Sequence, residues 1–526
     1  MQISSETPST SPWWKHSVCY QVYVRSFADS DGDSVGDMTG IEQGLPYLAE
    51  LGVDSVWITP FYTSPQHDHG YDVADYRDVD RLFGSLADFD SMLAKAHELG
   101  LRVIVDLVPN HTSNEHEWFR KALAAEPDSP ERDLYVFRDG RGPDGSEPPN
   151  NWRSVFGGPA WTRVEDGQWY LHMFDASQPD LNWWNPRVGD EFESIIRFWL
   201  DRGVDGFRVD VAHGLYTPVE MADLTPEQLS NLGASTYPMW DQPEVHDVYR
   251  RWRKILDEYD GERMAVAEAW TATPESMARY IRPDELQQAF NFHWLQAPWS
   301  AESFRKVIDE SLHAVSLAGA AATWVLSNHD VVRHVTRYGG GDRGLARAKG
   351  ALLTMLSLPG GAYIYQGEEL GLEEVEVAPE HRQDPTWLRG GGIGRDGCRV
   401  PIPWSGDEPP FGFGPGQAQP WLPQPADWTG LSVAAQEDDP DSTLSFYRRA
   451  LRARRELTEN LPDSVTMLDS APETLAFVRG SGMVCFLNCG ETPAPVPAEA
   501  GELVLSSAPL VDGQLPADAA AWFRTA

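Results

Sequence analysis

The chain has 526 residues, which is enough for several domains or for one barrel with smaller additions. Its 80 acidic and 42 basic residues give a net charge of −38, which disfavours nucleic acid, anionic membranes and polyanionic substrates and favours a neutral partner. No apolar run approaches the length of a membrane span, and the polar residues 1–12 lack a signal-peptide pattern, so a cytoplasmic protein is expected. The four cysteines are too few and too scattered for a disulfide framework.

An acidic turn follows the first predicted strand. Val18–Phe27 is rich in β-branched and aromatic residues, as strands are. Aspartates then recur over a few positions, and carboxylates this crowded repel one another unless a cation lies between them. A hard cation is therefore predicted at this turn, bound by Asp29, Asp31, Asp33, Asp37 and the carbonyl of Val35. The turn departs from the EF-hand pattern, and a solvated acidic turn is the alternative.

Helices and strands alternate along the rest of the first half. Helical spacing over Ile41–Gly52 and Phe89–Gly100 alternates with strands over Asp54–Pro60 and Leu101–His111. Alternating apolar strands and helices predict a parallel sheet with right-handed crossovers. The alternation resumes with a helix over Val188–Gly203. The later predicted strands are Phe207–Ala212, Met264–Trp270, Gln288–His293, Ala322–Asp330 and Ala362–Glu369.

Eight such strands predict an α/β fold, a TIM (β/α)₈ barrel with an inserted subdomain after the third strand and a C-terminal all-β domain. The barrel is assigned to residues 1–111 and 187–460. Residues 112–186 are rich in Gly, Pro, Asn and Trp, which indicates an irregular inserted subdomain. Residues 461–526 contain short β-prone pieces after the predicted helix Ser442–Glu456, and predict a β-sandwich.

Charged residues collect at the predicted C-terminal ends of these strands. Arg208 and Asp210 lie two residues apart, so both side chains leave the same face of one strand and can pair. Burying such a pair is costly without a partner network or a task. Other strand ends carry Asp106, His111, Glu268, His329 and Asp330. A structural role easily explains one buried carboxylate. Several carboxylates that face one barrel mouth are harder to explain in that way.

Four segments resemble the signature segments of the α-amylase family, glycoside hydrolase family 13. They are Asp106-Leu-Val-Pro-Asn-His111, Gly206-Phe-Arg-Val-Asp-Val-Ala-His213, Ala267-Glu-Ala-Trp270 and Ser327-Asn-His-Asp330. The acidic turn, His69-Gly-Tyr-Asp72 and Gln178-Pro-Asp-Leu-Asn182 are similar to the α-glucosidase and oligo-1,6-glucosidase branch. The resemblance implies a retaining, exo-acting α-glucosidase that hydrolyses terminal non-reducing α-glucosyl residues of short oligosaccharides through a covalent glucosyl-enzyme intermediate.

The resemblance also implies a role for each site residue. Asp210 would be the nucleophile, Glu268 the general acid and then base, and Asp330 the carboxylate that stabilises the transition state. Arg208 would orient Asp210. The sugar would be held by Asp68, Tyr71, His111, His329 and Arg399, with Arg395 matching the family less closely, and Phe156 and Gln178 would line its pocket. The family's acidic turn binds calcium or magnesium, and no organic cofactor is implied.

Three functions stay open at this level. The glucosyl-enzyme can be intercepted by water, which gives hydrolysis, or by a sugar, which gives glucosyl transfer or disaccharide isomerisation. A non-catalytic binding relative is the remote alternative, since all three carboxylates are present. Val211 resembles the residue found in relatives that cut α-1,6 bonds, but one side chain leaves α-1,4 and α-1,6 cleavage both open. The expected partner is a small α-glucoside, and the expected assembly a monomer or small homo-oligomer.

Overall fold

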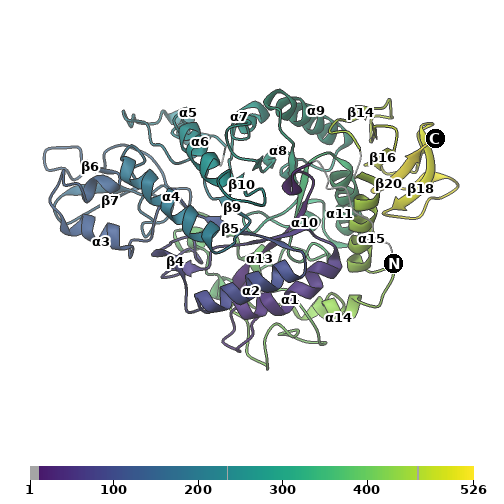
Figure 1. Cartoon of the computed structure of the whole chain (residues 1–526), viewed down its shortest axis with the longest axis horizontal. Coiled ribbons are helices and arrows are strands. Elements are labelled where there is room, and N and C mark those ends of the chain that lie inside the picture. Colours follow the sequence, from purple (N-terminus) through teal and green to yellow (C-terminus); the bar gives the residue numbers. More distant parts are fainter. Residues whose placement is uncertain (1–10, 234, 459–460) are drawn as a thin grey trace.

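A computed structural model describes residues 11–233, 235–458 and 461–526, and an eight-stranded parallel sheet forms its centre (Figure 1). The strands are β1 (Val18–Val22), β2 (Ser55–Ile58), β5 (Arg102–Leu107), β9 (Gly206–Val209), β10 (Met264–Ala267), β11 (Gln288–Ala289), β12 (Thr323–Val325) and β13 (Gly361–Tyr365). They pair in the order β11-β10-β9-β5-β2-β1-β13-β12. A parallel bridge between Phe290 and Thr323 joins the two outer strands and closes the barrel. The predicted TIM barrel is confirmed.

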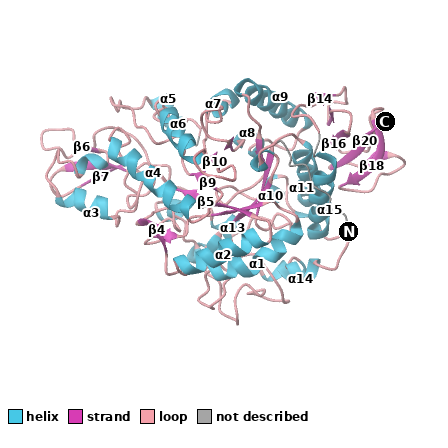
Figure 2. Cartoon of the chain, in the orientation of Figure 1, coloured by secondary structure: helices cyan, strands magenta, loops and turns pink. Residues whose placement is uncertain are grey.

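Helices surround this barrel (Figure 2). The longer ones are α1 (Met38–Leu51), α2 (Leu86–Glu98), α4 (Pro186–Asp201), α6 (Val245–Leu256), α9 (Ala301–Ala318), α11 (Gly341–Ser357) and α15 (Thr443–Thr458). Shorter ones are α5 (Pro226–Ser230), α7 (Pro274–Arg279), α10 (His334–Arg337), α12 (Pro385–Leu388), α13 (Asp396–Arg399) and α14 (Val433–Gln436). Helix α1 begins where the Asp37 side chain accepts the Gly40 N–H, and ends at Gly52, whose φ of +98° favours glycine. None of the described helices has the length and apolar character needed to cross a membrane.

Alternation along the strands builds two cores. Inward side chains such as Cys19, Trp57 and Ile104 form a cluster inside the barrel. Their outward neighbours, including Tyr20 and Val56, belong to the larger cluster beneath the helices. Side chains therefore fill the barrel, and ligands must bind at its mouth.

The barrel strands end earlier than the sequence predicted. Asp210 and Glu268 lie just beyond β9 and β10, although the Asp210 N–H still donates to the carbonyl of Leu107 at 2.8 Å. Strand β11 is shortest because the Asn291 side chain accepts the Trp294 N–H and starts helix α8 (Phe292–Leu295). The chain thus leaves each strand early, and the polar residues at the strand ends lie in turns around the mouth.

A separate antiparallel sheet lies between β5 and β9 in the sequence. Its strands β6 (Phe137–Asp139), β7 (Trp161–Arg163) and β8 (Gln168–Leu171) pair in the order β6-β8-β7, and helix α3 (Glu117–Ala124) accompanies them. This segment projects at one end of the molecule (Figure 1). An isolated β-bridge between His111 and Asp180 holds the end of this segment, where the chain returns to the barrel, beside the barrel mouth. The hairpin β3 (Tyr62–Thr63) and β4 (Asp75–Val79) frames the same side.

The chain ends in antiparallel sheets at the opposite end of the molecule (Figure 1). The larger sheet contains β14 (Thr466–Met467), β15 (Thr474–Arg479), β16 (Met483–Asn488), β20 (Ala519–Thr525) and β18 (Ala500–Ser506), and the smaller one β17 (Ala494–Pro495) and β19 (Gln514–Leu515). The Trp522 indole N–H donates to the Leu353 carbonyl of α11 at 2.9 Å and fastens the larger sheet to the barrel. The predicted C-terminal β domain is confirmed.

Candidate active site

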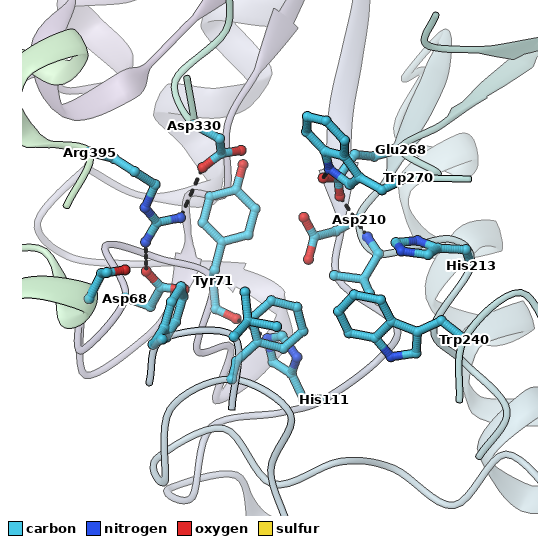
Figure 3. Close-up of a pocket in the computed structure, with 15 residues that line it drawn as sticks. Asp68, Tyr71, His111, Asp210, His213, Trp240, Glu268, Trp270, Asp330 and Arg395 are labelled. Atoms are coloured by element: carbon cyan, nitrogen blue, oxygen red, sulfur yellow. Dashed lines mark hydrogen bonds and ion pairs between the residues drawn. The ribbon is translucent and has the colours of Figure 1, made fainter. Parts of the chain in front are cut away.

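A cavity of about 220 Å³ opens at the C-terminal ends of the barrel strands (Figure 3). Its volume lies below the ~300–1,000 Å³ of sites that bury drug-sized ligands, so it suits a single sugar ring better than a long chain. Seven of the predicted site residues line it: Asp68, Tyr71, His111, Phe156, Asp210, Glu268 and Asp330. Arg208, Gln178, His329 and Arg399 lie behind the wall and contact lining residues.

Arg208 collects three carboxylates around one guanidinium. Its Nη1 donates to Asp210 Oδ1 at 2.5 Å and to Asp106 Oδ1 at 2.9 Å, and its Nη2 lies 3.1 Å from Glu268 Oε2. The pairing of Arg208 with Asp210 that the strand spacing predicted is confirmed. Asp210 and Glu268 are thereby held side by side by a single cation, which is only 1% exposed.

The surroundings of these carboxylates oppose full ionisation. Burial raises the pKa of Asp106 to about 7, against the lowering effect of Arg208. Burial likewise raises the pKa of Asp210, and Glu268 and Asp106 act in the same direction. Burial and the neighbouring carboxylates therefore favour the protonated forms of Asp106 and Asp210, against the opposing charge of Arg208.

Glu268 is oriented by donors on both of its oxygens. The Val211 backbone N–H donates to Oε2 at 2.8 Å, and the Trp270 indole N–H donates to Oε1 at 2.8 Å. Val211 has a φ of +43°, a conformation that β-branched residues rarely adopt. The turn after β9 therefore holds a strained backbone that points an N–H at this carboxylate.

Arg395 closes the far end of the cavity. Its guanidinium donates to Asp68 Oδ1 and Asp330 Oδ1, both at 2.9 Å (Figure 3). It also donates to Asp384 Oδ2 at 2.6 Å. Burial alone would raise the pKa of Asp330, but His329, whose Nε2 lies 3.3 Å from Oδ2, together with Arg395 and Arg399 lowers it well below its usual range. Burial raises the pKa of Asp68 to about 6, with Arg395 opposing. Asp330 is thus held ionised, whereas Asp68 takes up a proton more readily.

The two late arginines occupy different places. Arg395 lines the cavity and lies over the Phe156 ring at 4.9 Å. Arg399, the first choice from sequence, is fully buried and donates to Asp330 Oδ1 at 3.0 Å and to the His329 carbonyl at 2.8 Å. Arg395 is therefore the arginine that faces a ligand, and Arg399 supports Asp330 from behind.

A hydrogen-bonded chain fixes the imidazole of His329. The Gln21 amide meets Nδ1 at 2.7 Å, and Nε2 meets the Tyr71 hydroxyl at 2.7 Å. The Tyr71 hydroxyl in turn donates to Asp106 Oδ2 at 3.1 Å. Burial lowers the pKa of His329, so the ring is neutral, and Gln21 donating to Nδ1 leaves the proton on Nε2.

His111 is held beside the same pocket. Its Nδ1 lies 3.0 Å from Asn110 Oδ1, and the Gln178 amide lies 3.1 Å from Nε2. Gln178 also donates to Asp68 Oδ2 at 3.1 Å. Burial lowers the pKa of His111 to about 4, so a neutral imidazole faces the pocket.

The inserted segment and the loop after β13 meet over the cavity. Arg389 donates to Asp175 Oδ2 at 3.0 Å and to the Gly157 carbonyl at 3.1 Å. Gly391 packs so tightly there that a Cβ would lie 2.5 Å from the Phe156 carbonyl oxygen. These contacts wall the pocket on one side.

Further lining residues were not assigned from the sequence. They are Val155, Phe174, Val211, His213, Trp240, Trp270 and Thr386. Val211, His213 and Trp270 belong to signature segments and could have been chosen for that reason. Trp240, Val155 and Phe174 lie in long irregular loops and Thr386 lies in the short helix α12, where nothing in the local pattern separates pocket side chains from packing ones.

The acidic turn forms a compact cluster away from this cavity. Carboxylate oxygens of Asp29, Asp31 and Asp37 lie within 4.8 Å of one another. Asp29 and Asp37 also accept backbone N–H groups of the turn, for example that of Gly32 to Asp29 at 2.6 Å and that of Gly40 to Asp37 at 2.7 Å. Asp33 is exposed and lies outside this close group.

Replacing Arg395 by Lys should lower kcat/KM by roughly 10- to 100-fold. A single ammonium cannot reproduce the fork that bridges Asp68, Asp330 and Asp384. Steady-state rates on maltose and isomaltose measure the effect. Arg382→Lys is the matched control, because Arg382 lies over Trp387 in the same region outside the pocket lining, and it should leave the rate constants unchanged. Equal rates for wild type and Arg395→Lys would contradict the bridging role.

Comparisons with known proteins agree with this geometry. The family model described as alpha amylase, catalytic domain matches residues 21–461. A "probable alpha-glucosidase" of Rhizobium meliloti is 40% identical over 92% of this chain and 90% of its own, and an oligo-1,6-glucosidase of Parageobacillus thermoglucosidasius is 38% identical over 84% of each. The crystal structure of an alpha-glucosyl transfer enzyme superposes with a TM-score of 0.90 at 38% identity, covering 98% of this chain and all of that one. With its signature segments assembled at one barrel mouth, the chain belongs to the α-amylase family, glycoside hydrolase family 13.

Proposed function

We propose that the protein is a retaining, exo-acting α-glucosidase that removes terminal α-glucosyl residues from short oligosaccharides. The observation that carries this proposal is the pairing of Asp210 and Glu268, both lining the pocket, on one buried guanidinium behind its wall. Retaining glycosidases need two carboxyl groups about 5 Å apart, whereas inverting ones need a wider gap for water. Because Asp210 and Glu268 contact the same Arg208 guanidinium, the close spacing of a retaining glycosidase is favoured.

In the first step Asp210 attacks the anomeric carbon while Glu268 donates a proton to the leaving oxygen. These two roles require a proton on Glu268 and an ionised Asp210 in the reactive form. Asp330, held ionised by Arg395 and Arg399, stabilises the positive charge that develops on the sugar ring. His111, which lines the pocket, offers a neutral imidazole to sugar hydroxyls, and His329 positions the Tyr71 hydroxyl from behind the wall.

In the second step Glu268 accepts a proton from water, and the resulting oxygen nucleophile displaces Asp210 from the anomeric carbon. The donors from Val211 and Trp270 keep Glu268 in place while it changes from acid to base. Two displacements at one carbon return the α configuration.

The closed end of the pocket supports exo action. Arg395 ties Asp68 to Asp330 across the position of the terminal sugar, so an oligosaccharide cannot extend past it. Glucose release from maltose, isomaltose and maltotriose, each quantified against time, tests this proposal and ranks the two linkages. Glucose as the first product from maltotriose supports exo action, whereas internal cleavage of longer chains without glucose would contradict it.

Glucosyl transfer is the second candidate function. It is favoured by the similarity to an alpha-glucosyl transfer enzyme and by the apolar side chains that line one half of the pocket. Transfer uses the same intermediate and differs only in what attacks it. New glycosides formed at high acceptor concentration, measured beside free glucose, separate transfer from hydrolysis.

We further propose that the acidic turn binds Ca²⁺ or Mg²⁺ as a structural ion. Oxygen ligands of this kind suit hard cations, and Asp29, Asp31 and Asp37 are close enough to share one. Asp33 and the Val35 carbonyl would complete the shell through small shifts of the turn. The ion would fix the entry into α1, which Asp37 caps.

Removing this ion with a chelator should lower the melting temperature by several degrees. A ligand at 100 times its Kd stabilises the folded state by about 2.7 kcal/mol. Scanning calorimetry with and without EDTA measures the loss, and added Ca²⁺ or Mg²⁺ should restore it. Asp31→Asn should reduce the response. A melting curve that EDTA leaves unchanged would contradict the proposed cation site.

A further inference from the structure

A buried guanidinium outside the sugar pocket has no carboxylate partner. Arg25 lies in the 3₁₀ turn Val24–Ser26 after β1 and is 7% exposed, and its Nη1 donates to Gln66 Oε1 at 2.9 Å. Its Nε is buried without a hydrogen-bond acceptor, and no carboxylate in the described part of the chain forms an ion pair with it. Burying an unpaired charge is costly, so this cation needs a counter-charge from elsewhere.

Two further donors near Arg25 also lack acceptors. The Gln66 amide nitrogen and the Tyr23 hydroxyl are both buried, and neither has a hydrogen-bond partner among the described residues. Tyr23 and Arg25 lie against the same indole, that of Trp421, with the two aromatic ring centroids 6.3 Å apart and the guanidinium carbon 4.6 Å from the indole centroid. Because Gln66 turns its amide oxygen to Arg25, its unpartnered nitrogen can only donate. All of these groups would be satisfied by a ligand that accepts hydrogen bonds.

The charges around these donors favour an anion over a water molecule. Burial lowers the pKa of Arg25, and Arg399 acts in the same direction. Burial also lowers the pKa of His69, whose Nδ1 lies 3.3 Å from Arg399 Nη1, so this ring brings no compensating charge. The face of Trp421 attracts the guanidinium but carries no formal negative charge. A water would need acceptors for its own protons, whereas an anion only accepts and also neutralises Arg25.

The position of the donors suits a small ion. The unpartnered nitrogen and oxygen atoms are shielded from solvent, while Gln66 and Trp421 are each half-buried. Solvent therefore lies one side chain away, and an ion of atomic size can exchange where a phosphate or carboxylate could not pass.

We propose that Arg25, Gln66 and Tyr23 form a binding site for a small monovalent anion, which is chloride in ordinary salt solutions. The ion neutralises the guanidinium, accepts from the amide and the hydroxyl, and ties the turn at Gln66 to Trp421. This site is separate from the sugar pocket, and none of its three donors lines that pocket. The proposal does not depend on the proposed function, because binding and stability report it without any turnover.

Anomalous diffraction locates such an ion directly. Crystals of the wild-type protein are equilibrated with sodium bromide, and data are collected at the bromine K edge. An anomalous peak should lie in contact with Arg25 Nε and the Gln66 amide nitrogen. Peaks at exposed surface positions alone would mean an adventitious ion only and would overturn the proposal, as would an ordered water without anomalous signal beside Arg25.

Thermal unfolding tests the same site in solution. Sodium chloride and sodium methanesulfonate at equal ionic strength screen surface charges equally, but methanesulfonate is too bulky for the site. With Ca²⁺ held constant, the melting temperature should be about 1–2 °C higher in chloride, the shift for a large chain at ten to a hundred times Kd. Equal melting temperatures in the two salts would contradict the site.

A carboxylate built into the chain should replace the ion. Gln66→Glu keeps the side-chain shape and places a negative charge beside Arg25. Its melting temperature in methanesulfonate should rise to that of the wild type in chloride, and chloride should no longer change it. A chloride response equal to that of the wild type would place the ion elsewhere and overturn the proposal.

A matched pair of arginine variants completes the test. Arg25→Met should lose the chloride response. Arg382→Met should keep it, because Arg382 also lies over an indole, that of Trp387 at 4.4 Å, but is not one of the proposed donors. Loss of the response in both variants would show that chloride acts on the protein generally and would contradict the site. Should Arg25→Met fail to fold, the bromide map and Gln66→Glu still decide.

Discussion

Asp210→Asn should abolish turnover, with kcat lowered roughly 10⁴-fold or more. An amide has the shape of the carboxylate but cannot displace a leaving group from the anomeric carbon. The Asn carbonyl oxygen can still accept from Arg208, so the pocket should stay assembled. Steady-state glucose release measures the loss, and calorimetry should show a melting temperature close to that of the wild type.

Asp205→Asn is the matched control for this variant. Asp205 is a fully buried carboxylate immediately before β9, at the end of the strand opposite Asp210, and it pairs with Arg102 and Arg263 at 2.9 and 2.7 Å. Its replacement should lower stability while leaving the kcat of the folded enzyme unchanged. If Asp210→Asn kept more than a small fraction of the wild-type rate, Asp210 would not be the nucleophile.

Glu268→Ala should slow the cleavage of maltose by roughly 10²- to 10⁴-fold, because the sugar leaving group needs protonation. The first step with α-glucosyl fluoride should be far less affected, since fluoride leaves without a proton. Comparing single-turnover rates on the two donors isolates the role of the acid. Equal losses on both donors would show that Glu268 positions the substrate instead.

Sodium azide should restore turnover of the fluoride in Glu268→Ala and give α-glucosyl azide. Azide is a nucleophile that needs no base, and it would attack the glucosyl-enzyme from the face that the leaving group vacated. The same addition to the wild type should have little effect. β-Glucosyl azide as the product would show a single displacement of fluoride by azide and would contradict a covalent glucosyl-enzyme.

The barrel and the gathering of carboxylates at its mouth could be predicted because strong local signals agree there. The apolar strands alternate with capped helices, and Arg208 and Asp210 have the spacing of one strand face. The exact strand ends could not be predicted, because Asp210 and Glu268 look like continuations of β9 and β10 until the turns beyond them are seen. Strand β11 was overestimated for a similar reason, since Asn291 ends it by capping a helix.

The residues that form the pocket wall were harder to predict than the residues at the strand ends. The path of a glycine-rich loop decides whether Arg395 or Arg399 faces the sugar. The two arginines are only four residues apart, and this spacing does not reveal that path. Trp240 likewise lies far from any strand end and reaches the pocket only through the packing of a long loop on Phe174. Such residues are placed by tertiary contacts, which a single sequence does not display.

The most direct test of the central claim follows the anomeric protons by NMR while the enzyme cleaves maltose. Double displacement through Asp210, with Glu268 as acid and base, predicts that α-glucose from the non-reducing unit accumulates first and that β-glucose then grows by mutarotation. An early excess of β-glucose beyond that supplied by the reducing-end unit would show a single displacement by water, and would contradict a covalent intermediate on Asp210.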